Sequence, residues 1–152
     1  MSEGTDFFAA LVRYQIALWN ALDAALQQAH GVSLGRFQAL RVLRERGGNG
    51  RVQDVAGDLA ITIGAASKLV DRLERDGTAR REPNPNDRRS SLIALTPEGG
   101  RVHEAASATF EAALRANLPA ELVNASELSA LTAMLLRLHR QLQTRARTRT
   151  TA

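Results

Sequence analysis

Residues 52–99 read VQDVAGDLAITIGAASKLVDRLERDGTARREPNPNDRRSSLIALTPEG. The apolar spacing at the start of this stretch predicts a short helix over residues 51–59. Thr62 is expected to cap a second helix that runs to Asp76 and closes at Gly77. The inward stripe of that helix is Ala66, Leu69, Val70 and Leu73, and its outer face is small, polar and basic. Two short helices joined by a tight turn, with such an outer face, are typical of a helix-turn-helix.

The residues that follow predict a β-hairpin at about 79–96. Proline and asparagine at 83–86 favour a turn, and the apolar run from Leu92 to Leu95 can form a short strand. This arrangement places two arginines, at 88 and 89, at the hairpin tip. Thr96 and Pro97 then fit the N-cap and first position of another helix, which is expected to reach about Asn117.

Longer helices are expected on both sides of this central region. Residues 6–30 carry apolar side chains over a wider arc than one stripe, so this helix, which ends at Gly31, is expected to pack against two surfaces. Ser33 is expected to cap a helix that stops at the glycine-rich stretch 47–50. A last helix is expected from Ser126 through the leucine at 142. Residues 145–152 are predicted to form a disordered basic tail because they are too polar to pack.

Length and composition fit one globular domain. The chain has 152 residues, 44% of them hydrophobic and 24% charged, and no apolar run is long enough to predict a membrane helix. The N-terminal MSEGTDFF is acidic, which argues against a secretory signal, so the cytoplasm is the expected location. Because the chain has no cysteine, it offers no disulfide, thiolate metal ligand or thiol nucleophile.

Positive charge is concentrated in two parts of the chain. Five arginines and no acids lie between Arg137 and Arg149, and residues 36–101 hold thirteen basic and nine acidic residues. Such patchy basicity indicates a local anionic partner rather than general polyanion binding. Nineteen of the twenty cations are arginine, which suits phosphate and guanine recognition but is equally compatible with GC-rich coding DNA.

The sequence carries no recognisable catalytic or metal-binding motif. His30, His103 and His139 lie on different predicted segments, and there is no HExxH, nucleophile elbow or phosphate-binding loop. We therefore expect no enzymatic activity, no metal and no cofactor.

The central stretch resembles the multiple-antibiotic-resistance-regulator (MarR) family of bacterial transcription factors. Residues 52–81 resemble the family's helix-turn-helix, and NPNDRRSSLIALTPEG resembles its wing. The wing is the more specific part, with an Asp-x-Arg at Asp87 and Arg89 followed by the Leu-Thr-x-x-Gly that ends at Gly99. Two departures stand out. Thr78-Ala79 replaces a usual apolar pair, which is expected to loosen the seam between the second helix and the wing, and Asn84 replaces an acid.

The resemblance implies a mostly α fold with a small β wing, a winged helix-turn-helix flanked by long dimerisation helices. Residues 1–144 are then a single domain, in which 6–32 and 98–144 form the dimerisation helices and 33–97 form the winged-helix lobe. The first and last two helices would interlock in a homodimer, each subunit presenting one winged helix to double-stranded DNA. The alternative is that the flanking helices form a bundle within one chain.

The resemblance also assigns roles at the DNA face. On the second helix the candidate contacts are Thr62, Ala65, Ser67, Lys68 and Arg72, and on the wing they are Arg88 and Arg89. Arg89 is expected to enter the minor groove, with its guanidinium held by Asp87. Thr62 is expected to act mainly as the helix cap. The alternative interpretation is a solvated surface, in which Asp71, Glu74 and Asp76 pair with cations of their own helix such as Arg75.

Family likeness further implies a small aromatic or anionic effector, which would bind between the dimerisation helices and the winged helix. Candidate lining residues are Arg13, Tyr14, Trp19, His30 and Phe37, although simple core packing is the alternative role for Trp19. The expected function is a dimeric, sequence-specific transcriptional regulator, a repressor that such an effector releases from a palindromic operator. The alternatives are a constitutive DNA-binding protein without an effector, or a winged helix repurposed for protein or ligand binding.

Overall fold

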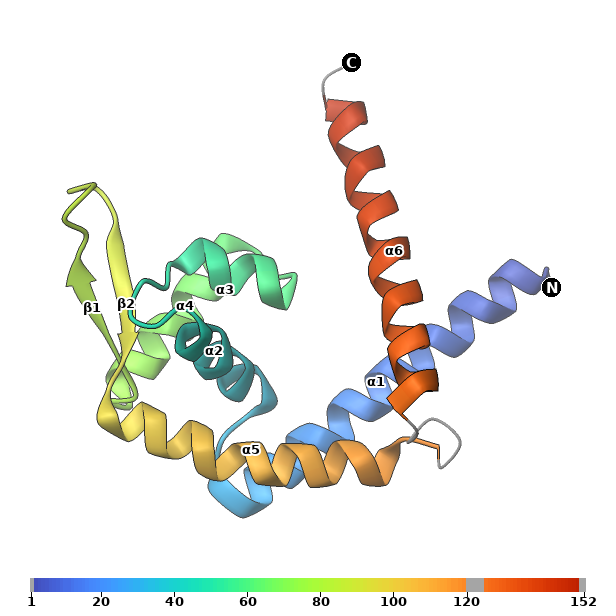
Figure 1. The fold of residues 1–152 in the computed structure, drawn as a ribbon, viewed down its shortest axis with the longest axis horizontal. Helices are drawn as coiled ribbons and strands as arrows, with labels where there is room; N and C mark the ends of the chain where they lie inside the picture. The colour runs from blue at the N-terminus through green and yellow to red at the C-terminus, as the bar shows by residue number, and fades with distance from the viewer. Residues whose placement is uncertain (1, 120–124, 151–152) are drawn as a thin grey trace. The chain divides into compact units, whose positions relative to one another are not determined.

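The structure, a computed structural model, describes residues 2–119 and 125–150, and at 125 and 145–150 it describes the backbone only. In chain order the elements are α1 (Glu3–His30), α2 (Leu34–Glu45), α3 (Val52–Leu59), α4 (Ile63–Arg75), β1 (Ala79–Pro83), β2 (Ser91–Leu95), α5 (Pro97–Asn117) and α6 (Ala125–Thr150) (Figure 1). The predicted fold class, mostly α with a small two-stranded wing after a helix-turn-helix, is confirmed.

The helices begin and end at residues whose side chains or backbone suit a cap. The hydroxyl of Ser33 accepts the amide of Arg36 at 3.3 Å, and that of Thr62 accepts the amide of Ala65 at 3.1 Å, so both predicted N-caps are confirmed. Gly31 ends α1 in the left-handed region at φ 63°, also as predicted. Helix α1 begins at Glu3 rather than at residue 6, because Ser2 supplies the N-cap.

Two apolar cores hold α1 to α5 and the wing together. One lies among α2, α3, α4 and the wing, and its fully buried side chains include Leu40, Leu43, Val55, Val70, Leu73 and Ile93. The other joins α1, α2 and α5 through Leu22, Leu26, Val32, Leu34, Phe37 and Ala106. The predicted inward stripe of α4 is confirmed, since it faces the first core. Helix α2 contributes to both cores and therefore links the winged helix to α1 and α5.

The wing is an antiparallel pair that runs from Ala79 opposite Leu95 to Pro83 opposite Ser91. Gly50 adds a short third edge, because the amide of Ile93 donates to the carbonyl of Gly50 at 2.7 Å. A Cβ at Gly50 would lie 2.6 Å from the Leu43 side chain, so only glycine brings this loop so close to the core. The base of the wing is thus fixed to the first core.

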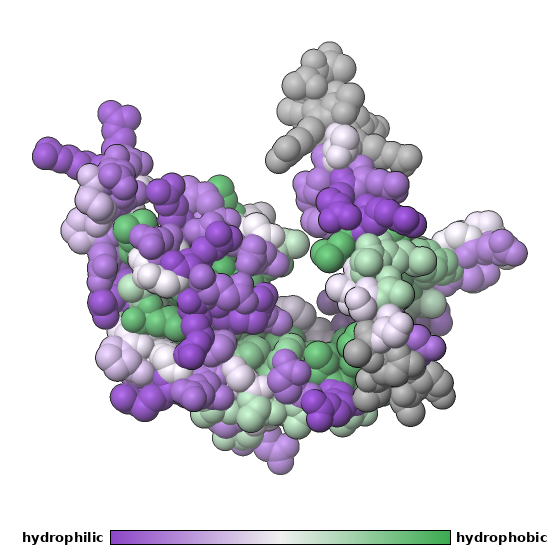
Figure 2. Space-filling model, viewed as in Figure 1, coloured by the Kyte–Doolittle hydropathy of each residue, from purple (hydrophilic) through white to green (hydrophobic). Residues whose placement is uncertain are grey.

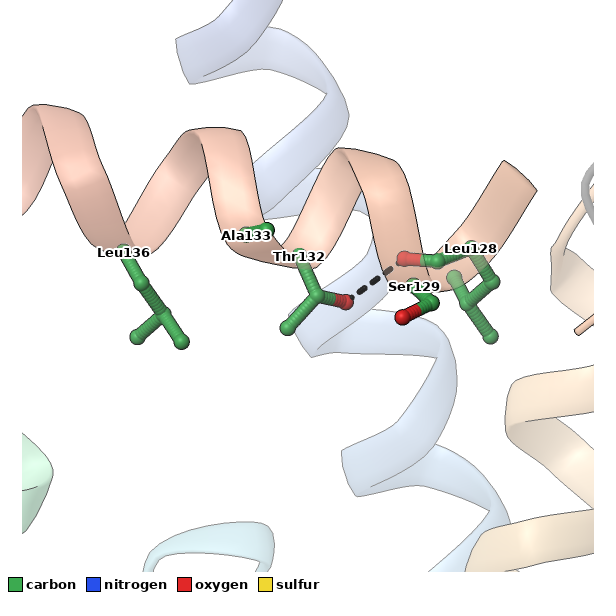
Figure 3. A pocket seen from close by; sticks show the side chains of 5 residues that line it. All are labelled: Leu128, Ser129, Thr132, Ala133 and Leu136. Carbon is green, nitrogen blue, oxygen red and sulfur yellow. Dashed lines mark hydrogen bonds between the residues drawn. The ribbon is translucent and has the colours of Figure 1, made fainter. Parts of the chain in front are cut away.

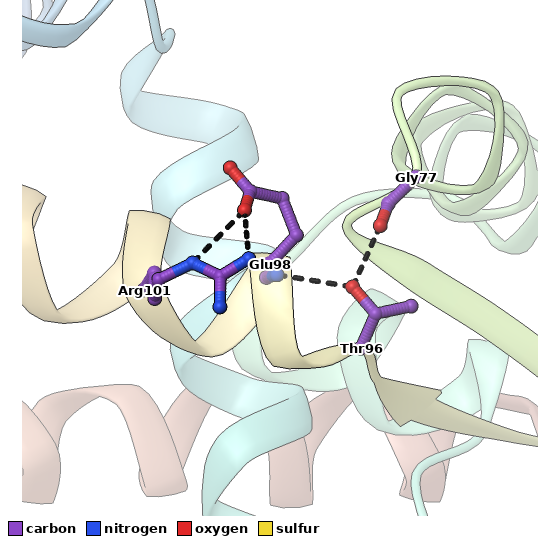
Figure 4. A network of polar contacts seen from close by, with 5 residues as sticks. Gly77, Thr96, Glu98 and Arg101 are labelled. Atoms are coloured by element: carbon purple, nitrogen blue, oxygen red, sulfur yellow. Dashed lines mark hydrogen bonds and ion pairs between the residues drawn. The ribbon is translucent and has the colours of Figure 1, made fainter.

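The seam between α4, the wing and α5 is tight. Thr78 is buried, its hydroxyl donates to the carbonyl of Leu73 at 3.0 Å, and its own carbonyl accepts the amide of Thr96 at 3.2 Å. The hydroxyl of Thr96 donates to the carbonyl of Gly77 at 2.6 Å and accepts the amide of Gly99 at 3.0 Å (Figure 4). The expectation that Thr78-Ala79 loosens this seam is wrong, because the polar atoms of Thr78 are satisfied inside it.

The chain divides into two compact units, with the boundary between Leu114 and Arg115. Helix α6 belongs to the second unit and is helical through Thr150, so the prediction of a disordered tail from residue 145 is wrong for 145–150. This end contains no glycine or proline, and arginine and alanine are good helix formers that prolong an existing helix. Residues 151–152 lie outside the described residues, and a single domain over 1–144 stays a prediction. No helix in the described ranges is long and apolar enough to cross a membrane.

Candidate nucleic-acid interface

The outer face of α4 is exposed and carries the predicted side chains. Ala65, Lys68 and Arg72 are exposed and Ser67 is partly exposed, whereas the hydroxyl of Thr62 is engaged as the N-cap. Figure 2 shows that the surface of the winged-helix lobe is largely hydrophilic. The face is therefore shaped to meet a polar partner, with small residues near the helix N-terminus and cations along its length.

The acidic residues of α4 are neutralised by arginines from other elements. Arg81 of β1 contacts Asp71 at 2.7 Å and Glu74 at 2.5 Å, and its backbone amide donates to Glu74 at 2.9 Å. Arg36 of α2 forms an ion pair with Asp76. The alternative in which these acids pair with cations of their own helix is therefore wrong.

The cations of α4 consequently remain available. In the part of the chain that the structure describes, Lys68, Arg72 and Arg75 form no ion pair. Because the carboxylates beside them already have partners, the net field at the outer face is positive. A positive face of this size attracts phosphate groups.

Hydrogen bonds within the wing tip hold it in one shape. Asn84 is buried, its side-chain amide donates to the hydroxyl of Ser90 at 2.8 Å, and its side-chain oxygen accepts the amide of Asn86 at 3.0 Å. The amide of Asp87 donates to the carbonyl of Asn84 at 3.2 Å. Asn84 is thus the residue that closes the turn, a role that its amide group performs and a carboxylate, which has no N–H, would not.

Asp87 orients the wing differently from the prediction. Its carboxylate accepts the backbone amide of Arg89 at 2.9 Å, so it fixes the turn rather than the guanidinium of Arg89. Asp87 binds the backbone amide of Arg89 because this amide is only two residues away, whereas binding the guanidinium would require the long Arg89 side chain to be ordered. This amide, then Ser90 and the charge of Arg51, lower the pKa of Asp87 below its usual range. Arg88 and Arg89 are exposed beyond the turn.

The proposed effector residues are not gathered in one place. Arg13, Tyr14 and Trp19 are exposed on α1, and residues at these spacings point to three different sides of a helix. His30 contacts the hydroxyl of Thr109 at 2.8 Å. Phe37 is buried in the second core, with its ring centroid 5.0 Å from that of Phe110. It is therefore a packing residue, and the prediction that it lines a crevice is wrong.

His103 of α5 is partly buried beside Phe37 of α2. Its ring stacks on Phe37 with centroids 5.5 Å apart, and its Nδ1 is buried without a hydrogen-bond partner. Burial, followed by the positive charges of Arg44 and Arg41, lowers the pKa of His103. His103 therefore stays neutral at physiological pH and acts as part of the packing between α2 and α5.

Three further residues of this surface were missed by the sequence analysis. Arg81 was not recognised as the partner of the α4 acids, although strand alternation places it on the same side as buried Ala79 and therefore toward the core. Ile61 and Ile63 flank the N-cap of α4 and are 37% and 59% exposed at this end of the helix. Exposed apolar side chains at such a place suit contact with the methyl group of thymine.

Known proteins resemble this chain in both sequence and structure. Residues 32–91 match the profile of the MarR family. The multiple antibiotic resistance protein MarR of Salmonella typhimurium is 44% identical over 46 residues, which is 30% of this chain, and the match spans about a third of that relative's length (32%).

Solved structures extend the likeness to nearly the whole chain. Sco3205, a MarR family transcriptional regulator from Streptomyces coelicolor solved in complex with DNA, has a TM-score of 0.84 at 25% identity and covers 94% of this chain and 89% of its own. CouR from Rhodococcus jostii, solved with p-coumaroyl-CoA, has a TM-score of 0.71 at 27% identity, covering 88% and 94%. The sequence profile over residues 32–91, the matched relative and the winged-helix fold agree in supporting a transcription factor of the MarR family.

Proposed function

We propose that this chain is a dimeric, sequence-specific DNA-binding regulator of transcription, which represses from a palindromic operator and is released by a small effector. The observation that carries the proposal is the outer face of α4, where three cations are unpaired while the neighbouring acids are held by Arg81 and Arg36. The DNA complex of the similar Sco3205 supports the same partner. In this proposal α4 enters the major groove, and the wing reaches the minor groove through Arg89.

A second copy of the chain is the proposed cover for the exposed apolar residues of the flanking helices. On α1 these are Phe7, Phe8, Leu11, Tyr14, Ile16 and Trp19, and on α6 they are Leu131, Met134, Leu135, Leu136, Leu138 and Leu142. The exposed apolar side chains of α6 support a partner surface, because a helix usually needs apolar packing to be stable in water. Light scattering at micromolar concentration is expected to give about 33 kDa, twice the chain mass. A stable folded species of 16.5 kDa would contradict the dimer.

An open hollow on the surface of α6 supports the proposal of a partner chain at this helix. This hollow of about 510 Å³ lies along the helix and is lined by Leu128, Ser129, Thr132, Ala133 and Leu136 (Figure 3). The hydroxyl of Thr132 donates to the carbonyl of Leu128 at 2.8 Å, so its polar group is satisfied within the helix. The hollow is therefore mainly apolar and fits aliphatic side chains better than a charged ligand.

The DNA proposal is tested by selecting bound genomic fragments and measuring affinity for the selected site. Arg89→Ala is expected to weaken binding and leave thermal stability nearly unchanged, because its side chain is exposed and the amide that Asp87 holds is retained. Ser67→Ala is expected to change which sequence is preferred, since base contacts specify and phosphate contacts position. Unchanged affinity of Arg89→Ala for the selected operator at moderate salt would refute the wing assignment.

Effector release is the second part of the proposal, supported by the ligand-bound structure of the similar CouR. Because Arg13, Tyr14 and Trp19 point to three different sides of α1, one compound cannot contact all three from a single helix face. The exposed aromatic ring of Trp19 is therefore the contact that this proposal retains. Since Trp19 is the chain's single tryptophan, its fluorescence reports directly on such binding. We expect quenching and DNA release over the same concentration range of one compound in a metabolite panel. DNA binding that no compound affects would favour a constitutive DNA-binding protein.

A further inference from the structure

The last part of α6 holds a concentration of positive charge that the winged helix does not account for. The chain carries arginine at 137, 140, 145, 147 and 149 and no acid after Glu127. Without these five arginines, fifteen cations remain against sixteen acids, so the net positive charge of the chain resides in this helix. Charge this concentrated exceeds what solubility of a helix end requires.

Two of these five arginines have described side chains, and both are exposed on α6. Helix α6 runs unbroken to Thr150, and the side chains of Arg137 and Arg140 are exposed. These two line a shallow hollow of about 380 Å³ together with Gln141 and Thr144. Within the described residues neither arginine forms an ion pair. The helix end therefore offers guanidinium groups, and α6 carries no carboxylate after Glu127.

The apolar and basic parts of α6 overlap in sequence between residues 137 and 142, and only the turns after Leu142 lack leucine. The exposed leucines end at Leu142, and the later turns hold arginine, threonine and alanine. Figure 2 shows the same change along α6, from hydrophobic patches on its early turns to hydrophilic surface further on. The leucine part is suited to a protein partner, whereas the arginine part lacks the aromatic or aliphatic side chains that anchor a helix in a lipid interface.

We propose that residues 137–149 of α6 form a second DNA contact, which binds phosphates of the duplex without reading its sequence. This inference rests on the proposed DNA-binding function and extends it to an element outside the winged helix. Arginine suits the role because its planar fork can hold a phosphate oxygen pair and never loses its charge. The contact would raise affinity for every DNA sequence equally.

The test is the salt dependence of DNA affinity. Each neutralised phosphate contributes about 0.9 to the slope of log affinity against log salt. If each arginine contacts one phosphate, the triple variant R145Q/R147Q/R149Q has a slope smaller by about 2.7 for each subunit that contacts the duplex. Its affinity then falls about 40-fold less than that of the parent between about 50 and 200 mM salt. We expect the double variant R137Q/R140Q to lose about 1.8 of slope. Both variants are expected to keep the operator preference of the parent.

A matched control separates local contact from net charge. The double variant R101Q/R115Q removes two exposed arginines of α5 and is expected to leave the slope within about 0.5 of the parent value. Circular dichroism and light scattering establish that each variant keeps its helix content and mass. A parent that binds no DNA refutes the proposed function itself. If the triple variant has the same mass and the same salt slope as the parent, the helix contact is refuted and the proposed DNA-binding function is not. An equal loss of slope in the control variant also refutes the helix contact. The helix contact is likewise refuted if the arginines of α6 bind anionic vesicles but their replacement leaves DNA affinity unchanged.

Discussion

Two adjacent glycines at the start of α5 provide a sharp test of how the wing is attached. A Cβ on Gly99 would lie 1.9 Å from the carbonyl oxygen of Thr78, whereas a Cβ on Gly100 would meet nothing within 4 Å. Real contacts of this kind do not come below 3.0 Å, so Gly99→Ala requires α5 and the Thr78 backbone to separate by about 1 Å. Atoms on both sides belong to the backbone and cannot rotate away.

The cost of that separation follows from the contacts at the seam. Overpacking by one methyl group costs about 1–3 kcal/mol. Moving α5 also strains the hydrogen bonds of Thr96 with Gly77 and of Thr78 with Thr96, each worth about 1 kcal/mol (Figure 4). The better helix propensity of alanine returns about 1 kcal/mol. The net loss for Gly99→Ala is then about 2–4 kcal/mol, or a fall in Tm of roughly 5–15 °C for a chain of this length.

Gly100→Ala is the matched control, one residue away in the same helical turn. It removes the same flexibility and meets no neighbour, so we expect it to stabilise the protein by about 0.5–1 kcal/mol. Thermal and urea denaturation at one fixed protein concentration measure both variants, since dimerisation makes stability depend on concentration. Equal stability of Gly99→Ala and the parent would show that α5 does not press on Thr78, and the account of the seam would be wrong.

Three further predictions concern charges around the DNA face and the core. Arg81→Gln is expected to lower the free energy of unfolding by about 0.5–2 kcal/mol and to weaken DNA binding, because it leaves Asp71 and Glu74 unpaired beside phosphate. The control is Arg80→Gln, which loses only the ion pair with Glu82, and equal effects of the two variants would refute the special role of Arg81. Asp87→Ala is expected to weaken operator binding about tenfold, because the Arg89 amide loses its acceptor, whereas Asp87→Asn retains an acceptor; equal loss of affinity in both variants would instead assign the effect to charge. The pKa of His103 is lowered in the folded chain, so the unfolded chain takes up a proton more readily and the free energy of unfolding is expected to fall as pH drops through about 6.5. His103→Phe is expected to remove this dependence in denaturation curves measured from pH 7.5 to 5.5, and an unchanged pH profile of the variant would contradict the assignment to His103.

The sequence predicted features that depend on neighbouring residues. Caps at Ser33 and Thr62 and the stop at Gly31 act within a few residues of the chain, and the inward stripe of α4 follows from helical spacing alone. The wing was predicted from its turn residues and short apolar strand, and the register then follows from pairing at the turn. The end of α6 was missed because polar composition was taken as disorder, although helix propagation needs only good helix formers and an existing helix.

The choice of partner among charged groups was the part that sequence reasoning could not supply. The three acids at 71, 74 and 76 lie within a few residues of the three cations at 68, 72 and 75. From the sequence alone, each acid could therefore form an ion pair with a cation of its own helix. The folded chain instead brings Arg81 across from β1 and Arg36 from α2, and these choices depend on how a strand and a second helix pack beside α4. The positive potential of the DNA face is therefore a property of the tertiary fold: the same helix alone, with its acids free to meet its own cations, would present a nearly neutral surface to phosphate. This is why Arg81, which itself need not touch DNA, is expected to matter for DNA affinity as much as a residue of the face.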